Sequence, residues 1–299
     1  MPRLARAPAP AEAVAQPVFV SGQRLDQALA LASARIGGAE ARREAEILIG
    51  HALGCSRAAL FAHGDRRLDQ PELEAIERLV AARAAGQPVA YLLGEREFFG
   101  LPFTVTEAVL IPRPETELLV ELALARLPVD ASGAIADLGT GSGAIAIVLA
   151  KLRPGLRVWA LERSPEALAV AHCNARRYQL PNLHLLESDW LSALPPATRL
   201  RMLVANPPYV AADDPHLDCG DLRFEPRMAL TPGADALAAY RAITAAAGAF
   251  LETGAWVLFE HGEQQGPALR ALLAKRGFTE ISSERDLEGR ERVSLGRWP

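Results

Sequence analysis

Short apolar runs alternate with helical patterns from residue 134 onward, and this rhythm restricts the fold more than any other feature of the sequence. The apolar runs are strand-like segments at 134–138, 156–161, 183–186, 202–205 and 256–260. Shorter strands are expected near Phe278 and Val293. Alternation of this kind is typical of a parallel sheet with helices on both faces. We therefore predict an α/β fold with a doubly wound, Rossmann-like sheet.

The rest of the chain divides into segments of different character. Residues 1–18 are rich in Ala and Pro without a continuous apolar run, which predicts a flexible tail rather than a signal peptide. Residues 19–88 carry three helical patterns, the first with Ser21 as its expected cap, and predict a small helical bundle. Aromatic and β-branched residues in 89–112 predict a β-hairpin linker. The sheet domain would then span 113–299.

A glycine-rich segment, DLGTGSG at 137–143, lies between the first strand and its helix. Gly139, Gly141 and Gly143 let the backbone turn tightly and approach a ligand closely. In parallel sheets such ligands bind at the carboxyl ends of the strands. A dinucleotide fingerprint would have its third glycine one residue later, where this chain has Ala144. On its own the motif fits either a tight turn or a nucleotide site.

Acidic residues end the next two strands. Glu162 lies 19 residues after Gly143, where a carboxylate can accept both hydroxyl groups of a ribose. After the third strand, Asp189 could accept from an adenine amine, and Trp190 could supply a flat apolar wall. A surface ion pair with Arg163 and a core position for Trp190 are the alternatives. Together with the glycine loop, these residues favour an adenosine-type ligand.

The fourth strand ends in NPPY, Asn206 to Tyr209. Pro207 and Pro208 fix φ and remove two backbone donors, which leaves the Pro207 carbonyl and the Asn206 side-chain oxygen as acceptors. Two fixed acceptors beside the ring of Tyr209 suit a planar –NH₂ group. Such acceptors would hold both hydrogens and aim the nitrogen lone pair at an electrophile. A rigid turn is the alternative without function.

The remaining sequence features narrow the cofactor and the partner. The glycine loop has no Lys-Ser or Lys-Thr pair, which argues against ATP and leaves S-adenosyl-L-methionine as the expected cofactor. The net charge is −4, residues 1–100 hold 12 Arg against 12 acidic residues, and the chain has only two lysines. We therefore expect no direct nucleic-acid partner. Scattered Cys and His residues predict no metal site and a cytoplasmic location, and no apolar run is long enough for a membrane partner.

Several segments together resemble one family, from about residue 21 to the C-terminus. They are FFGLPFTV, LIPRPETELLVE, SDW, NPPY, RFEP at 223–226, EHG at 260–262 and RDLEGRERV near the C-terminus. This combination resembles the HemK/PrmC family of class I S-adenosylmethionine-dependent methyltransferases. That family comprises the N5-glutamine methyltransferases of peptide chain release factors. One departure is that the ribose acid is Glu162, where many relatives carry Asp.

The resemblance implies a role for each matching residue. The cofactor would be held by Gly139, Thr140, Gly141, Ser142, Gly143, Glu162, Asp189, Trp190 and Asn206. The substrate amide would be held by Asn206, Pro207, Pro208 and Tyr209, of which Asn206, Pro207 and Tyr209 would be catalytic. The substrate would be the glutamine of a Gly-Gly-Gln motif in a bacterial release factor. The helical bundle would help to dock that protein, and we expect the enzyme to be a monomer.

Two other functions are compatible with parts of the sequence. NPPY also occurs in adenine-N6 methyltransferases that act on DNA or RNA, but those enzymes would need a basic recognition surface. A non-catalytic protein that binds the cofactor and docks on the translation machinery is the other alternative. The intact Asn206 and Tyr209 argue against it.

Overall fold

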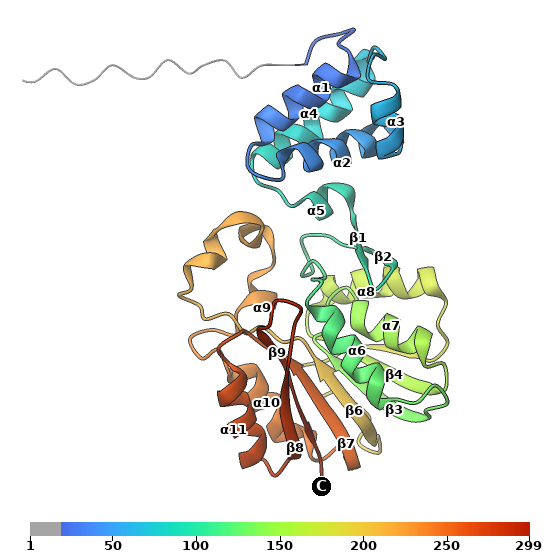
Figure 1. Ribbon diagram of the computed structural model, residues 1–299. Coiled ribbons are helices and arrows are strands. Elements are labelled where there is room, and N and C mark those ends of the chain that lie inside the picture. Colours follow the sequence, from blue (N-terminus) through green and yellow to red (C-terminus); the bar gives the residue numbers. More distant parts are fainter. Residues whose placement is uncertain (1–18) are drawn as a thin grey trace, which may run out of the picture. The chain divides into compact units, whose positions relative to one another are not determined.

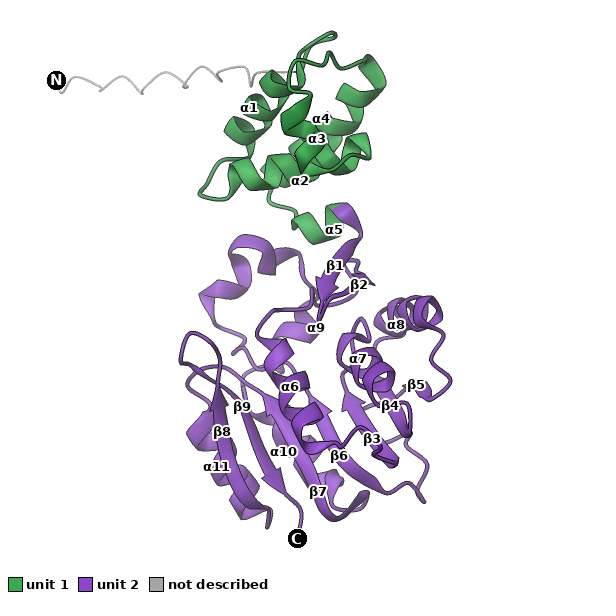
Figure 2. Cartoon of the chain, turned by 45° about the vertical axis from the view of Figure 1, so that its right-hand side comes forward, with its two compact units in different colours: residues 1–92 green, residues 93–299 purple. Residues whose placement is uncertain are grey.

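The computed structural model describes residues 19–299, and the tail predicted for residues 1–18 lies outside the described residues. The chain forms two compact units that divide between Leu92 and Leu93 (Figure 2). The division falls within the short helix α5 (Val89–Leu93). Across residues 19–299, no helix is both long and apolar enough to cross a bilayer.

The first unit is a helical bundle around its own apolar core. Its helices are α1 (Leu25–Ile36), α2 (Ala41–Leu53), α3 (Arg57–Ala62) and α4 (Gln70–Ala84). Residues three or four positions apart on α1, α2 and α4 face this core, for example Leu25 and Leu29 from α1 and Ile76 and Val80 from α4. Helix α4 begins with a capping box, in which the Asp69 side chain accepts from the Glu72 amide.

The start of the first helix differs from the sequence prediction. Ser21 does not cap α1, which begins at Leu25 with Arg24 at the cap position. Residues 22–24 instead pair with residues 66–68: the Gly22 amide donates to the Leu68 carbonyl at 3.2 Å, and the Leu68 amide donates to Gln23 at 2.9 Å. This extended pairing delays the first helical turn, because the same backbone groups cannot also be helical.

The second unit contains a seven-stranded sheet, seen at the lower part of Figure 1. Its strands are β3 (Gly133–Leu138), β4 (Leu156–Glu162), β5 (Leu183–Glu187), β6 (Leu200–Ala205), β7 (Leu251–Glu260), β8 (Thr279–Arg285) and β9 (Glu291–Arg297). Their order is β5-β4-β3-β6-β7-β9-β8, and β9 alone runs antiparallel to its two neighbours. The prediction of a doubly wound α/β sheet is confirmed.

Helices cover both faces of this sheet (Figures 1 and 2). One face is covered by α6 (Thr116–Arg126), α7 (Ala144–Leu152) and α8 (Pro165–Tyr178), the other by α10 (Ala238–Ala247) and α11 (Gly266–Lys275). Neighbouring strand residues contribute to different cores, as Ile135 and Ala136 do. Because both faces are covered, the central strands are apolar at nearly every position rather than at alternate ones.

Two irregular parts of the second unit lie beside the sheet. The hairpin of β1 (Glu95–Phe98) and β2 (Leu101–Thr104) turns at Phe99 and Gly100, both with positive φ. After β6 the chain forms a long excursion that contains η1 (Pro215–Asp218), η2 (Gly220–Phe224) and α9 (Arg227–Leu230). Backbone bonds close its base, from the Val210 amide to Leu230 and from the Ala212 amide to Gly233.

The register of the central strands aligns the segments that carry the predicted site. Leu138 pairs with Leu161 on one side and with Ala205 on the other, and Ala205 pairs with Phe259. The residues that follow these positions therefore emerge side by side at the carboxyl edge of the sheet. They are the glycine loop, Glu162, Asn206 and Glu260.

Candidate active site

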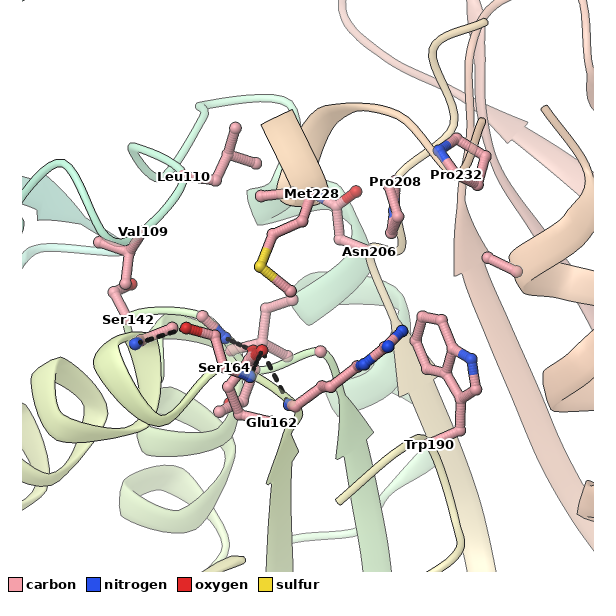
Figure 3. A pocket seen from close by; sticks show the side chains of 18 of the residues that line it. Val109, Leu110, Ser142, Glu162, Ser164, Trp190, Asn206, Pro208, Met228 and Pro232 are labelled. Atoms are coloured by element: carbon pink, nitrogen blue, oxygen red, sulfur yellow. Dashed lines mark hydrogen bonds between the residues drawn. The ribbon is translucent and has the colours of Figure 1, made fainter. Parts of the chain in front are cut away.

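A cavity of about 500 Å³ opens at this carboxyl edge, and most of the predicted site residues line it. Those that do are Gly139, Thr140, Gly141, Ser142, Glu162, Asp189, Trp190, Asn206 and Pro208. Gly143, Pro207 and Tyr209 do not contribute to its wall. Figure 3 shows Glu162 and Ser164 on one side of this space, with Asn206 and Met228 across from them. The glycine loop, Glu162 and the NPPY asparagine thus share one cavity.

The glycine loop needs its glycines for conformation and for space. Gly139, Gly141 and Gly143 have φ values of +70°, +56° and +83°, where a side chain would be strained. A Cβ on Gly143 would also lie 3.1 Å from the Ile147 side chain. A Cβ on Gly141 would meet nothing within 4 Å, so this backbone faces open space. The loop is therefore shaped for a ligand to approach its main chain.

Asp137, a buried acid with no predicted role, binds this glycine loop through Thr140. Asp137 is fully buried, and its Oδ2 accepts the hydroxyl of Thr140 at 2.6 Å, while Oδ1 has no partner. Burial is the main cause that raises the pKa of Asp137 to about 7, and the Thr140 hydroxyl opposes this rise. The carboxyl group thus ties the glycine loop to β3, although burial makes its ionised form unfavourable.

We expect Asp137→Asn to change stability in a pH-dependent way. Between about pH 4 and pH 7, the folded protein keeps a proton on Asp137 that the unfolded chain has lost, so wild-type stability falls as pH rises through this window. The asparagine side chain does not titrate in this pH range, so the variant lacks this contribution to the pH dependence. The difference in unfolding free energy, variant minus wild type, should increase between pH 5 and pH 8 by on the order of 2 kcal/mol in urea titrations. A difference that does not change with pH would contradict this expectation.

Glu162, at the end of β4, is 8% exposed and binds the backbone of two loops. Its Oε1 accepts from the amides of Arg163 at 2.9 Å and Ser164 at 3.0 Å. Its Oε2 accepts from the Gly141 amide at 2.9 Å and retains a second acceptor site. The longer arm of Glu therefore reaches back to the glycine loop, and one oxygen still offers capacity to a ligand in the cavity.

The SDW segment forms a turn that positions the side chain of Trp190. The Ser188 hydroxyl donates to the Trp190 carbonyl at 2.7 Å and accepts from the Ala193 amide at 3.0 Å. Trp190 has a φ of +52°, an uncommon value for a bulky residue, which this serine stabilises. A Cβ on Gly139 would lie 3.7 Å from the Trp190 ring, so the indole packs beside the glycine loop. Trp190 and the exposed Asp189 both line the cavity.

In the NPPY segment, Asn206 and Pro208 line the cavity and Pro207 is buried. The Asn206 Nδ2 atom donates to the hydroxyl of Thr116, the first residue of α6, at 3.2 Å. The side-chain oxygen is the remaining polar group of this amide. Since Thr116 takes the nitrogen, an acceptor is left for a substrate at this position.

Tyr209 lies on the other side of the segment, away from the cavity wall. Its ring packs over Gly262, where a Cβ would lie 3.6 Å from Cδ2, and its carbonyl accepts from Gln265 at 2.9 Å. Burial is the main cause that raises the pKa of the Tyr209 phenol, which stays protonated.

Within residues 19–299, acidic, His and Cys side chains form no group of three that could hold a metal ion.

Arg113 and Met228 also line the cavity, and neither has a predicted role. Arg113, from PRPET, forms an ion pair with the buried Glu225, from RFEP, and the Ile111 amide also donates to Glu225 at 3.1 Å. This contact ties the segment before α6 to the excursion after β6. Met228 is 52% exposed, and its side chain extends into the cavity in Figure 3. The only sequence signal for Arg113 and Glu225 was their presence in the PRPET and RFEP segments, and no sequence signal pointed to Met228.

Comparison with known proteins first defines the class. Residues 27–94 match the model of the PrmC N-terminal domain, and residues 115–224 match the methyltransferase small domain. A solved structure of the T. thermophilus 16S rRNA N2 G1207 methyltransferase, in complex with AdoMet and guanosine, shares the fold. Its TM-score is 0.50 at 19% identity, over 69% of this chain and 50% of that one. Fold and family model together define a methyltransferase with a class I sheet.

Two curated relatives identify the family. The release factor glutamine methyltransferase of Burkholderia pseudomallei (strain K96243) is 53% identical over 86% of this chain and 92% of its own length. The protein of the same name from Escherichia coli (strain K12) is 44% identical over the same shares. This chain belongs to the family of release factor glutamine methyltransferases. The resemblance inferred from the motifs is confirmed.

Proposed function

We propose that this protein transfers a methyl group from S-adenosyl-L-methionine to the side-chain amide nitrogen of glutamine in the Gly-Gly-Gln motif of a bacterial release factor. The observation that carries this proposal is the single cavity shared by the glycine loop, Glu162 and Asn206. The names of the relatives support the release factor as substrate. No observation favours adenine in DNA or RNA.

The residues of the cavity fit the proposed cofactor. Gly143, the cap residue of α7, has no side chain to bind the first N–H groups of the helix, and Ala144 and Ile145 of its first turn line the cavity, which suits the carboxylate of a methionine moiety. Glu162 Oε2 keeps acceptor capacity for ribose hydroxyls, and Trp190 offers a flat apolar wall for adenine. When bound, S-adenosylmethionine supplies an electrophilic methyl group.

Asn206 would act on the substrate by orientation. An amide nitrogen is a poor nucleophile, because its lone pair is delocalised. We propose that the Asn206 oxygen and the carbonyl of the peptide bond between Pro207 and the cavity-lining Pro208 accept the two N–H groups of the glutamine amide and so hold the nitrogen for attack. Both acceptors also stabilise the positive charge that develops on this nitrogen. Transfer first gives a cationic N-methylated amide that still carries both nitrogen protons. This cation is strongly acidic, so it can release one proton to water without a protein base in contact with the nitrogen.

The function can be tested with labelled S-adenosylmethionine, purified release factor and duplex DNA offered in the same reaction. We expect label on the release factor, and none on a release factor whose Gly-Gly-Gln glutamine is replaced by alanine. Label on DNA alone would show that the cavity acts on a different planar nitrogen. We further propose that the helical unit of residues 19–92 docks the release factor and that the enzyme acts as a monomer.

We expect Tyr209→Phe to reduce kcat less than about threefold. The Tyr209 ring packs over Gly262, and the ring is retained in the variant. Removing a hydroxyl that takes no part in transfer should leave the transition state unchanged. Steady-state kinetics on release factor would measure this, with Tyr209→Ala as the comparison that removes the packing. A loss of 10²-fold or more in Tyr209→Phe would instead assign the hydroxyl a chemical role.

A further inference from the structure

A buried carboxyl group lies directly behind Asn206, and the proposed mechanism has not used it. Glu260 is the last residue of β7 and is 1% exposed. Ala205 pairs with Phe259 in the parallel register of β6 and β7, so Asn206 and Glu260 occupy the next positions on neighbouring strands. The Tyr240 hydroxyl donates to the Glu260 carbonyl at 2.7 Å and holds this end of the strand.

Thr116 links the carboxyl group to the asparagine. The Asn206 Nδ2 atom donates to Thr116 Oγ1 at 3.2 Å, and Thr116 is 5% exposed. Hydrogen bonds from the side chains of Thr116 and Asn206 stabilise the ionised form of Glu260, whereas its Oε2 atom has no partner. An ionised carboxylate can only accept hydrogen bonds. The Thr116 hydroxyl must then donate toward Glu260 and accept from Asn206.

The direction of the hydrogen bond between Asn206 and Thr116 matters, because one end of the asparagine amide accepts hydrogen bonds and the other end donates them. With the nitrogen turned to Thr116 and Glu260, the Oδ1 acceptor is left for the cavity. If the carboxyl group were protonated, it could donate to Thr116, and Thr116 could donate to Asn206. The amide would then turn its NH₂ group toward the cavity, where it would repel an –NH₂ substrate.

We propose that Glu260 is a positioning residue that acts through Thr116 to hold the Asn206 amide with its oxygen toward the substrate. The inference rests on the proposed function for its effect on turnover, but the orientation of Asn206 can be observed without any substrate. Glu260 does not line the cavity, so we expect it to contact neither substrate nor cofactor.

The surroundings of Glu260 make the direction of the hydrogen bonds between Asn206, Thr116 and Glu260 sensitive to pH. Burial is the largest cause that raises the pKa of Glu260 to about 7; Thr116, Arg292 on β9 and Asn206 oppose this rise, and Glu115 before α6 adds to it. The phenols of Tyr209 and Tyr240 also face this carboxylate and stay protonated, since burial raises the pKa of both. Turnover should therefore be full above about pH 7 and fall as pH decreases through the pKa of Glu260.

The first arm of the test is kinetic and uses the full-length protein with release factor between pH 6 and 9. We expect Glu260→Gln to lower kcat at pH 8 about 10- to 30-fold, with S-adenosylmethionine Kd changed less than threefold, because a glutamine can donate to Thr116 and reverse the relay. The fall in kcat near pH 7 should disappear. Thr116→Val should lose a similar factor, and Thr116→Ser, which retains the hydroxyl, should recover most of it. Tyr240→Phe removes only the bond to the Glu260 carbonyl and should keep the wild-type pH profile.

The second arm observes the asparagine itself. The chain has only three asparagines, so selective ¹⁵N labelling gives three side-chain amide pairs. Asn174 donates to the carbonyls of Thr104 and Ser142, and Asn182 donates to Ala150 and Leu156, so both serve as internal references. We expect the Asn206 pair, assigned by its loss in Asn206→Ala, to shift between pH 6 and 8 in the wild type and not in Glu260→Gln.

The outcomes are distinguishable. An Asn206 pair that does not shift in the wild type, or kinetics of Glu260→Gln that match the wild type at every pH, would overturn the role of Glu260. If Glu260→Gln does not fold, Thr116→Val with wild-type kcat would overturn it equally. A wild type that methylates no release factor, but shows an Asn206 shift that Glu260→Gln abolishes, would refute the proposed function and leave the positioning of Asn206 supported.

Discussion

Replacing Asn206 by alanine is expected to lower kcat on release factor by about 10² or more, while S-adenosylmethionine affinity changes only several-fold. The Asn206 side chain lines the cavity, and its amide nitrogen is taken by Thr116 at 3.2 Å. The oxygen that alanine removes is thus the group available to a substrate amide. Because it stabilises charge that develops only during transfer, its loss should appear in kcat.

Stopped-flow or steady-state kinetics and calorimetric titration of the cofactor would separate the two effects. Met228→Leu is a suitable control, because Met228 lines the same cavity without a hydrogen-bonding group in the proposed mechanism, and the variant should lose less than about fivefold. Unchanged turnover in Asn206→Ala would rule out the amide-holding mechanism. A large loss of cofactor affinity would mean that Asn206 acts mainly in binding.

Replacing Glu162 by alanine should weaken S-adenosylmethionine binding by about 10²-fold. Three backbone amides donate to this carboxylate, those of Gly141, Arg163 and Ser164. The substitution would remove the Gly141 contact of the glycine loop and the proposed ribose acceptor, while the amides of Gly139 and Thr140 still donate to the Leu161 carbonyl of β4. Each lost hydrogen bond to a charged group contributes on the order of 1–3 kcal/mol, and solvent can replace part of it at the cavity.

Isothermal titration of the cofactor and urea unfolding would measure both consequences. Glu187→Ala is a matched control, because Glu187 is the register partner of Glu162 at the end of β5 and is exposed. It should change cofactor Kd by less than about twofold. Equal effects of the two substitutions would show that the loss of a negative charge at this edge, rather than the three amide contacts, controls binding.

Much of the fold could be predicted, because its signals are local. The apolar runs that became β3, β4, β6 and β7 are covered on both faces, and such strands are apolar at nearly every position. The glycine loop was equally visible, since Gly139, Gly141 and Gly143 adopt the positive φ values that only glycine takes without strain. The same kind of local reasoning was wrong for Ser21, which was predicted to cap the first helix. Backbone pairing of residues 22–24 with residues 66–68 moves the start of that helix to Leu25.

The contacts of the candidate site could not be predicted in the same way. Asn206 and Thr116 are 90 residues apart in the sequence, and Arg113 and Glu225 are 112 residues apart. No periodicity connects such pairs. The side on which the Tyr209 ring packs, over Gly262, was also undetermined, because the two prolines before it fix φ without choosing a neighbour.

The sequence by itself determined which segments are strands, which turns need glycine or proline, and which polar residues follow a strand. These properties depend on the allowed backbone angles and the hydrophobicity of a few adjacent residues. Only the tertiary structure decided that Glu260 and Thr116 lie behind Asn206 and that Glu162 binds the glycine loop. The physical reason is that the order and register of β4, β3, β6 and β7 are set by the packing of the whole sheet with its helices.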